Sequence, residues 1–254
     1  MRILKLVLAL AIAVGFVLPT AYADGKSVPV LLYHNVLESY DSSDSIVTIT
    51  PERLEEHITA LLNAGYTPIS FDNYIDASKG TYELPEKPVI ITFDDGYETN
   101  YTYAYPILKK HGVLATIFVA VESVGKKPGD YPHFTWEQAR EMNQSGLISI
   151  QSHTYTHRDI TLLSQFEALR EIRYSKYLIE KNLGTKCKVL AFPYGFHNPT
   201  HIKLAHDAGY DLTVKVGNYG KNTPGQGQDA LVRITVYGSW TGKDLTGRIN
   251  DYHR

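Results

Sequence analysis

The stretch Val89-Ile90-Ile91-Thr92-Phe93-Asp94-Asp95-Gly96 joins a short apolar run to two carboxylates and a glycine. Five β-prone residues bounded by turn residues are typical of a buried strand. Adjacent side chains on an extended chain point in different directions, so one of the two carboxylates can hold a metal ion while its neighbour faces a water molecule. The structural alternative is an Asp-Gly turn in which Asp95 caps the next helix.

Similar apolar runs recur along the chain, with helix-like intervals between them. The predicted strands are residues 28–33, 66–70, 89–93, 113–119, 147–151, 189–192, 212–216 and 231–236. The predicted helices are residues 51–64, 100–111, 135–145, 162–182 and 199–208. This alternation indicates a parallel sheet in a single α/β domain. We predict a deformed (β/α) barrel of seven or eight strands, with an open doubly wound sheet as the alternative.

The predicted strand 147–151 is followed by Ser152-His153-Thr154-Tyr155-Thr156-His157. Both candidate folds gather ligands at the carboxyl ends of their strands, so this segment is expected to meet the two aspartates. Zinc binds imidazole nitrogen and carboxylate oxygen, and catalytic zinc keeps one position for water. Asp95, His153 and His157 are therefore the predicted metal ligands.

Two other predicted strands end in residues that suit hydrolysis. His34 follows the run 28–33 and is a candidate general acid, because histidine side chains exchange protons near neutral pH. A histidine hydrogen-bonded in the loop is the alternative. Pro193-Tyr194-Gly195 follows 189–192, and the Tyr194 backbone N–H in this rigid turn is a candidate oxyanion donor. Four such strand ends together indicate a metal-dependent hydrolase site.

Two further features are expected to be structural. His197 and His201 form a second histidine pair at a helix start, and we expect His201 on the helix surface. Cys187 is the only cysteine, so no internal disulfide can form. Because free cysteines are usually buried, we expect Cys187 to be a packing residue.

The composition bounds the class of protein. Of the 254 residues, 43% are hydrophobic and 20% charged, which is typical of a globular domain. The formal net charge of −2 gives no basic field, so nucleic acid is not an expected partner. We expect a monomer.

The amino-terminal residues predict export. Arg2 and Lys5 precede the apolar run 6–18, and Ala21-Tyr22-Ala23 supplies small residues around a cleavage point. This pattern is typical of a secretory signal peptide, and the run is short for a membrane span. We predict a signal peptide at 1–23, a catalytic domain at 24–254 and a secreted or cell-surface protein with no membrane segment after cleavage. A retained anchor is the alternative.

Three segments resemble motifs of the polysaccharide deacetylases, carbohydrate esterase family four. They are Thr92-Phe93-Asp94-Asp95-Gly96, the segment 152–157 and Phe192-Pro193-Tyr194-Gly195. The resemblance implies a deformed β/α barrel and a divalent metal, zinc or else Co²⁺ or Ni²⁺, on Asp95, His153 and His157. It also implies that Asp94 is the general base. His34, in Leu31-Leu32-Tyr33-His34, resembles the amino-terminal histidine of the branch that includes poly-N-acetylglucosamine deacetylases.

The chain departs from the commoner family pattern in two places. The arginine expected just before Pro193-Tyr194 is absent, and no Leu-x-His motif occurs near the carboxyl terminus. Arg233 is a candidate for the missing positive charge beside Asp94, with an ordinary core-rim arginine as the alternative. Trp240 is a candidate platform for a sugar ring, since aromatic faces suit that contact.

The resemblance implies removal of N-acetyl groups from N-acetylglucosamine units of a cell-wall or extracellular polysaccharide. An O-acetyl esterase acting on xylan-like glycans would use the same residues, and a non-catalytic glycan-binding protein on this fold is the other alternative. A metallopeptidase is disfavoured, because no His-Glu-x-x-His motif is present. Substrate specificity is expected in the loops 122–133 and 218–229.

Overall fold

The computed structural model describes residues 25–41, 44, 46–217, 220–227, 230–250 and 252. The predicted signal peptide lies outside these residues. The strands are β1 (Val30–Tyr33), β2 (Asn35–Val36), β3 (Thr48–Ile49), β4 (Thr67–Pro68), β5 (Pro88–Phe93), β6 (Ala115–Val119), β7 (Ile148–Ser152), β8 (Val189–Ala191), β9 (Leu212–Val216) and β10 (Leu231–Thr235). The α-helices are α1 (Pro51–Asn63), α2 (Phe71–Ser78), α3 (Tyr105–His111), α4 (Trp136–Gln144), α5 (Gln165–Leu183), α6 (Pro199–Asp207) and α7 (Gly242–Asn250).

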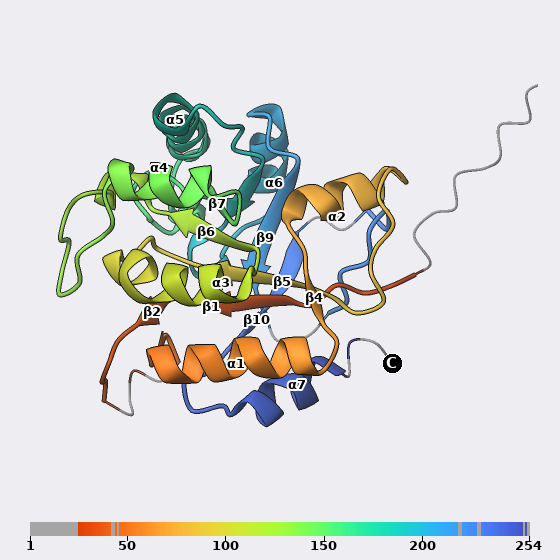
Figure 1. Cartoon of the computed structure of the whole chain (residues 1–254). Coiled ribbons are helices and arrows are strands. Elements are labelled where there is room, and N and C mark those ends of the chain that lie inside the picture. The colour runs from red at the N-terminus through yellow and green to blue at the C-terminus, as the bar shows by residue number, and fades with distance from the viewer. Residues whose placement is uncertain are drawn as a thin grey trace, which may run out of the picture.

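Seven parallel strands close into a barrel with helices around it (Figure 1). The order is β1-β10-β9-β8-β7-β6-β5, and β1 closes the ring because it pairs with β10 on one side and β5 on the other. Val30, for example, is in register with both Arg233 and Ile90. This closure confirms the predicted barrel and excludes the open sheet. The run 66–70 contributes only the short β4, which pairs with β5 outside the ring.

Alternate strand residues divide the core into two layers. Val89, Ile91 and Phe93 of β5 pack outward into the main cluster beneath the helices, whereas Ile90 belongs to a second cluster with residues of the other strands. Because side chains alternate along a strand, Thr92 and then Asp94 follow Ile90 on the inner face. The barrel interior is therefore apolar at the amino ends of the strands and polar at their carboxyl ends.

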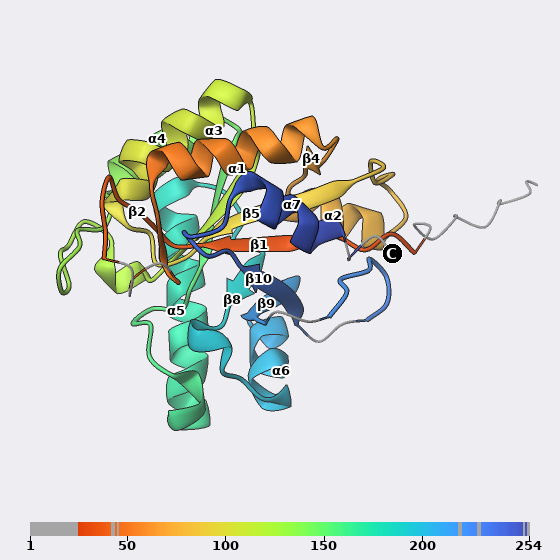
Figure 2. The ribbon, with the colours of Figure 1, turned by 90° about the horizontal axis from the view of Figure 1, so that it is seen from below.

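Helix α2 belongs to the inner cluster. Phe71 and Tyr74 pack there, and the Phe71 ring lies 5.9 Å from the ring of Phe118. This helix was not predicted, and neither were α7 and the short β2–β3 pair. In Figure 2, α7 lies beside α1 on the flank of the barrel near β1.

The helix starts follow from their capping residues. Thr50 accepts a hydrogen bond from the Arg53 backbone N–H, with Pro51 in the first turn, as predicted for α1. Helix α5 begins at Gln165 rather than 162, because residues 160–162 form a separate 3₁₀ turn and Ser164 makes a capping box with Glu167. The predicted helix 100–111 begins as a π-helical turn, Asn100–Ala104, before α3.

The two loops expected to set specificity lie at different ends of the barrel. Residues 122–133 fold back over the turn after β5, where the Glu98 N–H donates to Pro132 O and the Phe134 N–H to Gly96 O. The described part of 218–229 lies at the amino ends of the strands, since Asn222 bonds to the backbone of Val28 and Val232. The expectation for that second loop was therefore wrong for the residues described.

Two smaller predictions have different outcomes. Cys187 is fully buried, as expected, and burial raises the pKa of its thiol to about 12. His201 was expected on a helix surface but is only 5% exposed, because its ring accepts the Asn198 N–H in the capping box of α6. No helix in the described part of the chain has the length and apolar character that a membrane crossing requires.

Candidate metal-dependent active site

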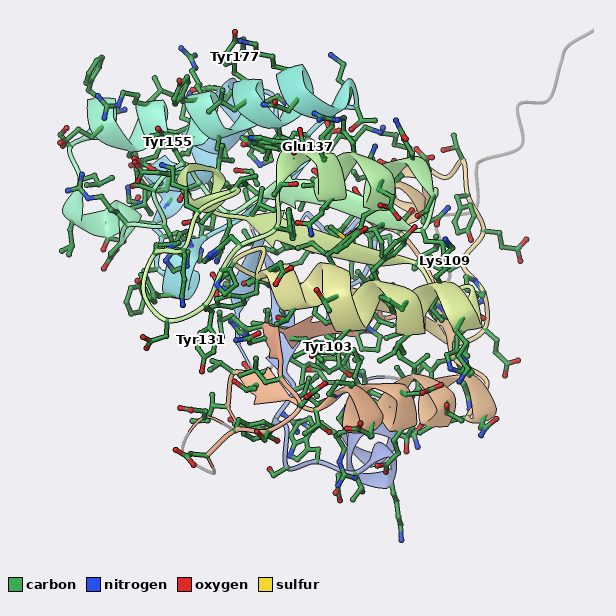
Figure 3. All side chains as sticks on the ribbon, turned by 60° about the vertical axis from the view of Figure 1, so that its left-hand side comes forward. Tyr103, Lys109, Tyr131, Glu137, Tyr155 and Tyr177 are labelled. Atoms are coloured by element: carbon green, nitrogen blue, oxygen red, sulfur yellow. The ribbon has the colours of Figure 1, made fainter. Side chains whose placement is uncertain are left out.

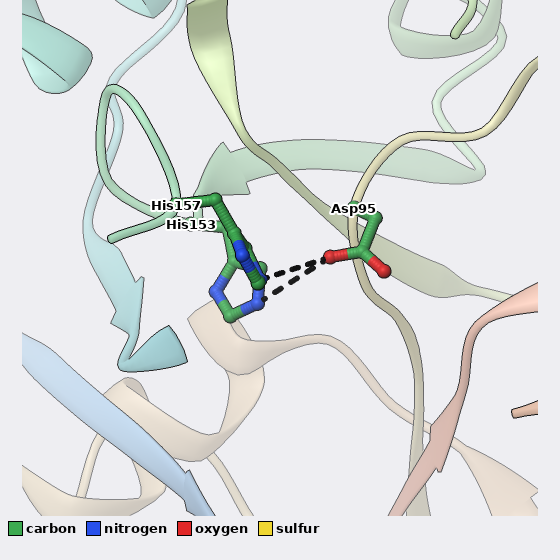
Figure 4. Close-up of side chains that lie close together, drawn as sticks. All are labelled: Asp95, His153 and His157. Carbon is green, nitrogen blue, oxygen red and sulfur yellow. Dashed lines mark ion pairs between the residues drawn. The ribbon is translucent and has the colours of Figure 1, made fainter. Parts of the chain in front are cut away.

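Asp95, His153 and His157 converge at the carboxyl ends of β5 and β7 (Figure 4). His157 Nε2 lies 3.2 Å from Asp95 Oδ1, and His153 Nε2 lies 3.8 Å from the same oxygen. One ligand atom from each residue lies within 4.8 Å of the others, and no second such group of three occurs among the described residues. The structure therefore brings together the three predicted ligands.

The donor set fits a divalent cation. Bonds of ~2.0–2.1 Å in a tetrahedral site separate ligand atoms by roughly 3.3 Å, close to the distances from Asp95 Oδ1. His153 Nδ1 lies 2.8 Å from Ala191 O, and a carbonyl only accepts, so Nδ1 carries the proton. The Nε2 lone pair of His153 is left facing the cluster, which is the arrangement that metal-binding histidines use.

Burial and charge set the protonation of the cluster. Burial lowers the pKa of His153 to about 4, so its imidazole is neutral at neutral pH. Burial opposes ionisation of Asp95, but the hydrogen bond with His157 and the nearby histidine charges outweigh it and lower the Asp95 pKa. The same hydrogen bond raises the pKa of His157 against the effect of its burial. A cation that binds here must displace the His157 proton.

The turns that present these groups have an unusual backbone. Asp95, Thr154, His157 and Tyr194 are the four non-glycine residues with positive φ in the described part of the chain, at 70°, 66°, 60° and 58°. Such conformations are costly for residues with a Cβ atom and are commonly found at functional sites. Gly96, with φ 80°, continues the Asp95 turn, and a Cβ atom there would lie 3.0 Å from Val119 Cγ1. In the pattern Asp-Asp-Gly, the carboxylates thus serve the site and the glycine serves the turn.

Asp94 lies inside the barrel and is held by Arg233 of β10. Arg233 Nη1 donates to Asp94 Oδ1 at 2.6 Å and Nη2 to Oδ2 at 2.7 Å, and both side chains are almost completely buried. Burial raises the cost of the Asp94 charge, but the charge of Arg233 outweighs this and lowers the Asp94 pKa. Asp94 Oδ2 also lies 3.4 Å from His153 Nε2. Asp94 is therefore an ionised carboxylate beside the metal cluster.

His34 follows β1 at the same end of the barrel. The Asn100 side chain donates to the His34 carbonyl at 2.8 Å, which fixes its backbone. The His34 Nδ1 atom is buried and has no hydrogen-bond partner among the described residues. The His34 side chain lies close enough for its charge to lower the pKa values of Asp94 and Asp95. This effect is smaller than those of burial and of Arg233 on Asp94, and of burial and of His157 on Asp95. The structure thus places His34 beside both aspartates.

Tyr194 lies at the edge of the site, whereas Trp240 lies away from it. Buried Pro193 begins the 3₁₀ turn 193–195, and the exposed Tyr194 ring lies 4.9 Å from the ring of His157. The Trp240 ring packs on Tyr237, and its carbonyl lies 2.7 Å from His57 Nε2 of α1. Among the described residues, no contact joins Trp240 to Asp95, His153 or His157. The structure does not support its prediction as a sugar platform at this centre.

The sequence profile described as polysaccharide deacetylase matches residues 81–213, a range that contains Asp94, Asp95, His153 and His157. The chain belongs to the polysaccharide deacetylase family. The *Bacillus subtilis* protein YxkH, whose name places it among polysaccharide deacetylases, is 35% identical over 212 residues, covering 82% of this chain and 71% of that protein. The *Escherichia coli* poly-β-1,6-N-acetyl-D-glucosamine N-deacetylase is 30% identical over 71% of this chain.

Solved structures agree with this family assignment. *Streptococcus pyogenes* deacetylase PplD, solved with acetate, superposes with a TM-score of 0.78 at 27% identity, covering 87% of this chain and 97% of that one. IcaB from *Ammonifex degensii* gives 0.78 at 27% identity, with 89% and 98% covered. The chain spans about a third of the length of the *E. coli* enzyme, at 32%.

One buried residue that braces the histidine loop of this family member was not predicted from the sequence. Glu171 of α5 is 3% exposed, and its carboxylate accepts the backbone N–H groups of Tyr155 at 3.1 Å and Thr156 at 2.7 Å. It also accepts the Thr156 hydroxyl at 3.0 Å. The only sequence signal for Glu171 is an acid on the inward face of an amphipathic helix, where acids are rare unless paired. Glu171 positions the loop that carries His153 and His157.

Neither His133 nor Tyr97 was chosen from the sequence as a site residue. They form an isolated bridge between the 122–133 loop and the turn after β5, and their rings lie 5.0 Å apart. Burial raises the Tyr97 pKa, and the Asp95 charge raises it further. His133 is 8% exposed, and burial lowers its pKa despite the Asp95 charge. Tyr97 and His133 therefore lie beside the metal-ligand residues, on the side of Asp95.

Proposed function

We propose that the protein is a zinc-dependent deacetylase that removes N-acetyl groups from N-acetylglucosamine units of a polysaccharide. The observation that carries the proposal is the division between the two aspartates. Asp95 faces His153 and His157, whereas Asp94 is held separately by Arg233 beside the same cluster. The names of the *E. coli* and *Staphylococcus aureus* relatives, poly-β-1,6-N-acetyl-D-glucosamine N-deacetylases, support the substrate class.

Asp95, His153 and His157 would hold the metal ion. Two imidazole nitrogens and one carboxylate oxygen suit zinc, and Co²⁺ or Ni²⁺ are the alternatives. What such an ion supplies is polarisation of the acetyl carbonyl and a lowered pKa of the attacking water.

The remaining steps belong to side chains of this protein. Asp94, kept ionised by Arg233, accepts the proton of the water that attacks the acetyl carbon. The Tyr194 backbone N–H in the turn after β8 donates to the oxyanion that develops. His34 donates a proton to the sugar nitrogen as the amide C–N bond breaks, so acetate and a free amine leave. In this proposal Pro193 fixes the turn that aims the Tyr194 N–H.

Location and domain organisation complete the proposal. The sequence pattern of residues 1–23 supports an exported protein whose residues 24–254 form the catalytic domain. The substrate would then be a glycan outside the cytoplasm, processed by a monomer.

Acetate release tests the proposal directly. Purified protein loaded with zinc is incubated with N-acetylglucosamine oligomers, peptidoglycan or acetylated xylan, each with and without a chelator. Chelator-sensitive acetate release from the amino-sugar substrates is the expected result, and Asp94→Asn is the inactive control. Release from xylan alone would identify an O-acetyl esterase instead. No release from any substrate by protein with bound metal would favour a glycan-binding protein.

A further inference from the structure

A recess lies on the outer face of α5, beside the loop that carries His153 and His157. Its volume is about 660 Å³, within the range of pockets that bind organic ligands. Aromatic rings and two guanidinium groups dominate its lining, supplied by Tyr155, Phe166, Arg170, Arg173, Tyr174 and Tyr177. We call this recess the α5 groove. Figure 3 shows Tyr155 and Tyr177 along this side of the molecule, near α5.

Three of the groove's aromatic side chains are exposed, although Tyr155 at its edge is half-buried against the core. Phe166, Tyr174 and Tyr177 are 77%, 42% and 54% exposed. They lie on one face of the helix, because positions 8 and 11 residues after Phe166 return to the same side. The opposite face of α5 is buried and packs on the barrel through residues that include Ala168, Ile172 and Ile179. Exposed aromatic side chains gathered on one face are typical of a binding surface.

The groove begins at the loop that carries His153 and His157. Tyr155 lies between His153 and His157 in the chain, and its ring is 4.8 Å from the ring of Tyr174. The Tyr174 ring in turn stacks on Tyr177, with centroids 6.2 Å apart and planes 15° apart. The rings therefore form a row that leads from the histidine loop along α5.

The charged side chains that line the groove are both arginines. Arg170 and Arg173 both line it, and neither forms a salt bridge in the described part of the chain. Lys181 Nζ lies 5.7 Å from the centroid of the Tyr177 ring. A deacetylated sugar carries an ammonium group near neutral pH, and these cations would repel it. An acetylated sugar is neutral and offers a carbonyl oxygen to a guanidinium donor.

We propose that the α5 groove binds still-acetylated sugar units of the glycan chain whose next units enter the active site. This inference rests on the proposed N-deacetylase function and adds a substrate-binding site to it. The tyrosine and phenylalanine faces stack on the apolar faces of the sugar rings, and Arg170 and Arg173 donate to acetamido oxygens. The groove thus retains acetylated segments and releases segments that have already lost their acetyl groups.

The test compares a groove variant with a matched control. Phe166→Ser combined with Tyr177→Ser removes two exposed rings, and Tyr103→Ser removes one tyrosine ring that lies on another helix and bonds to Glu38. Binding of fully acetylated and fully deacetylated N-acetylglucosamine hexamers is measured by calorimetry on chelator-treated protein. Acetate release is then measured on the acetylated hexamer and on the disaccharide with zinc-loaded protein.

We expect the groove variant to bind the acetylated hexamer about tenfold more weakly and to show a similar rise in KM for it. Its kcat on the hexamer and its kcat/KM on the disaccharide should match wild type, as should all values of Tyr103→Ser. Wild type should bind the deacetylated hexamer more weakly than the acetylated one.

Several results would overturn the inference. They are an unchanged hexamer affinity in the groove variant, or equal affinity of wild type for both hexamers. A wild-type dimer in sedimentation that the groove variant dissociates would assign the face to self-association instead. If wild type binds the acetylated hexamer through the groove but releases no acetate, the proposed function fails while the groove is established as a glycan site.

Discussion

Arg233 and Asp94 form a two-bonded ion pair inside the barrel, although 139 residues separate them in the chain. The two strands that carry them, β10 and β5, lie on either side of β1. The Arg233 guanidinium also lies 5.2 Å from the centroid of the Phe118 ring. The apolar surroundings strengthen the pair, and the pair in turn keeps a carboxylate ionised where an isolated one would take up a proton.

Removal of Arg233 should destabilise the protein and impair catalysis. Arg233→Met leaves the Asp94 charge buried without its partner, a change that typically costs about 3–5 kcal/mol. Urea unfolding checks this value, and acetate release should fall sharply in the same variant. Arg53→Met, which breaks an exposed pair with Glu56, is the control and should cost no more than about 1 kcal/mol. Equal effects of the two substitutions would contradict the role given to Arg233.

Substitutions of the two aspartates should have different effects, because Asp95 is assigned to metal binding and Asp94 to proton transfer. Asp95→Asn should lower zinc affinity, because a neutral amide replaces the anionic ligand between the two histidines. Asp94→Asn should retain normal zinc content and lose turnover. Zinc content by atomic absorption, measured beside acetate release, distinguishes the variants. Zinc loss in both would show that Asp94 is also a ligand, and retained activity in Asp94→Asn would remove it as the base.

His34 should matter in proportion to the basicity of the leaving group. An amine leaves an amide only when protonated, so His34→Ala should slow N-deacetylation by roughly 10²–10⁴. An aryl acetate releases a stable phenolate without that proton, and its hydrolysis should change little. The ratio of the two rates in wild type and variant is the measurement. Equal losses on both substrates would assign His34 a structural role.

Glu171 should act on the metal site through the loop it holds. Glu171→Ala removes the acceptor for two backbone N–H groups, and we expect zinc affinity to fall about 10–100-fold. Glu171→Gln keeps one oxygen for those groups and a donor for the Thr156 hydroxyl, so it should largely restore zinc binding. Glu167→Ala, on the same helix but in its capping box, should leave zinc affinity unchanged. No rescue by Gln would argue against this bracing.

The histidines of the cluster should give opposite pH dependences of stability in metal-free protein. The pKa of His153 is about 4 in the fold and 6.5 ordinarily, so the unfolded chain binds more protons between these values. The stability that wild type has over His153→Gln should therefore shrink as pH falls from about 6.5 to about 4.

For His157 the pKa is raised, so its contribution is present below the ordinary value of 6.5 and is lost as pH rises through the folded value. The stability that wild type has over His157→Gln should therefore shrink as pH rises above about 6.5. Urea unfolding of the three proteins in chelator at several pH values checks both signs. Parallel curves for the two variants would contradict the assigned protonation states.

The local sequence was sufficient to predict where the barrel strands lie along the chain and which site residues follow their carboxyl ends. The run 89–93 is buried at every position, and parallel strands must end at one edge, so Asp94, Asp95, His153 and His157 could be placed together before any coordinates. The start of helix α1 was equally predictable from the sequence, because Thr50 and Pro51 are local capping signals. The sequence also suggested Arg233 as a partner for Asp94, but only as one of two alternatives.

Tertiary structure decided the rest, because these features depend on residues distant in the chain. Closure at seven strands depends on β1 pairing with β5 and β10, and no local pattern in 66–70 indicates that β4 stays outside the ring. Glu171 is one acid among many until α5 packs its inner face on the histidine loop. The contact between the Trp240 carbonyl and His57 of α1 joins residues far apart in the chain, so only the folded structure could show it. Sequence periodicity determines which face of an element is buried, whereas the partner of that face is set by long-range packing.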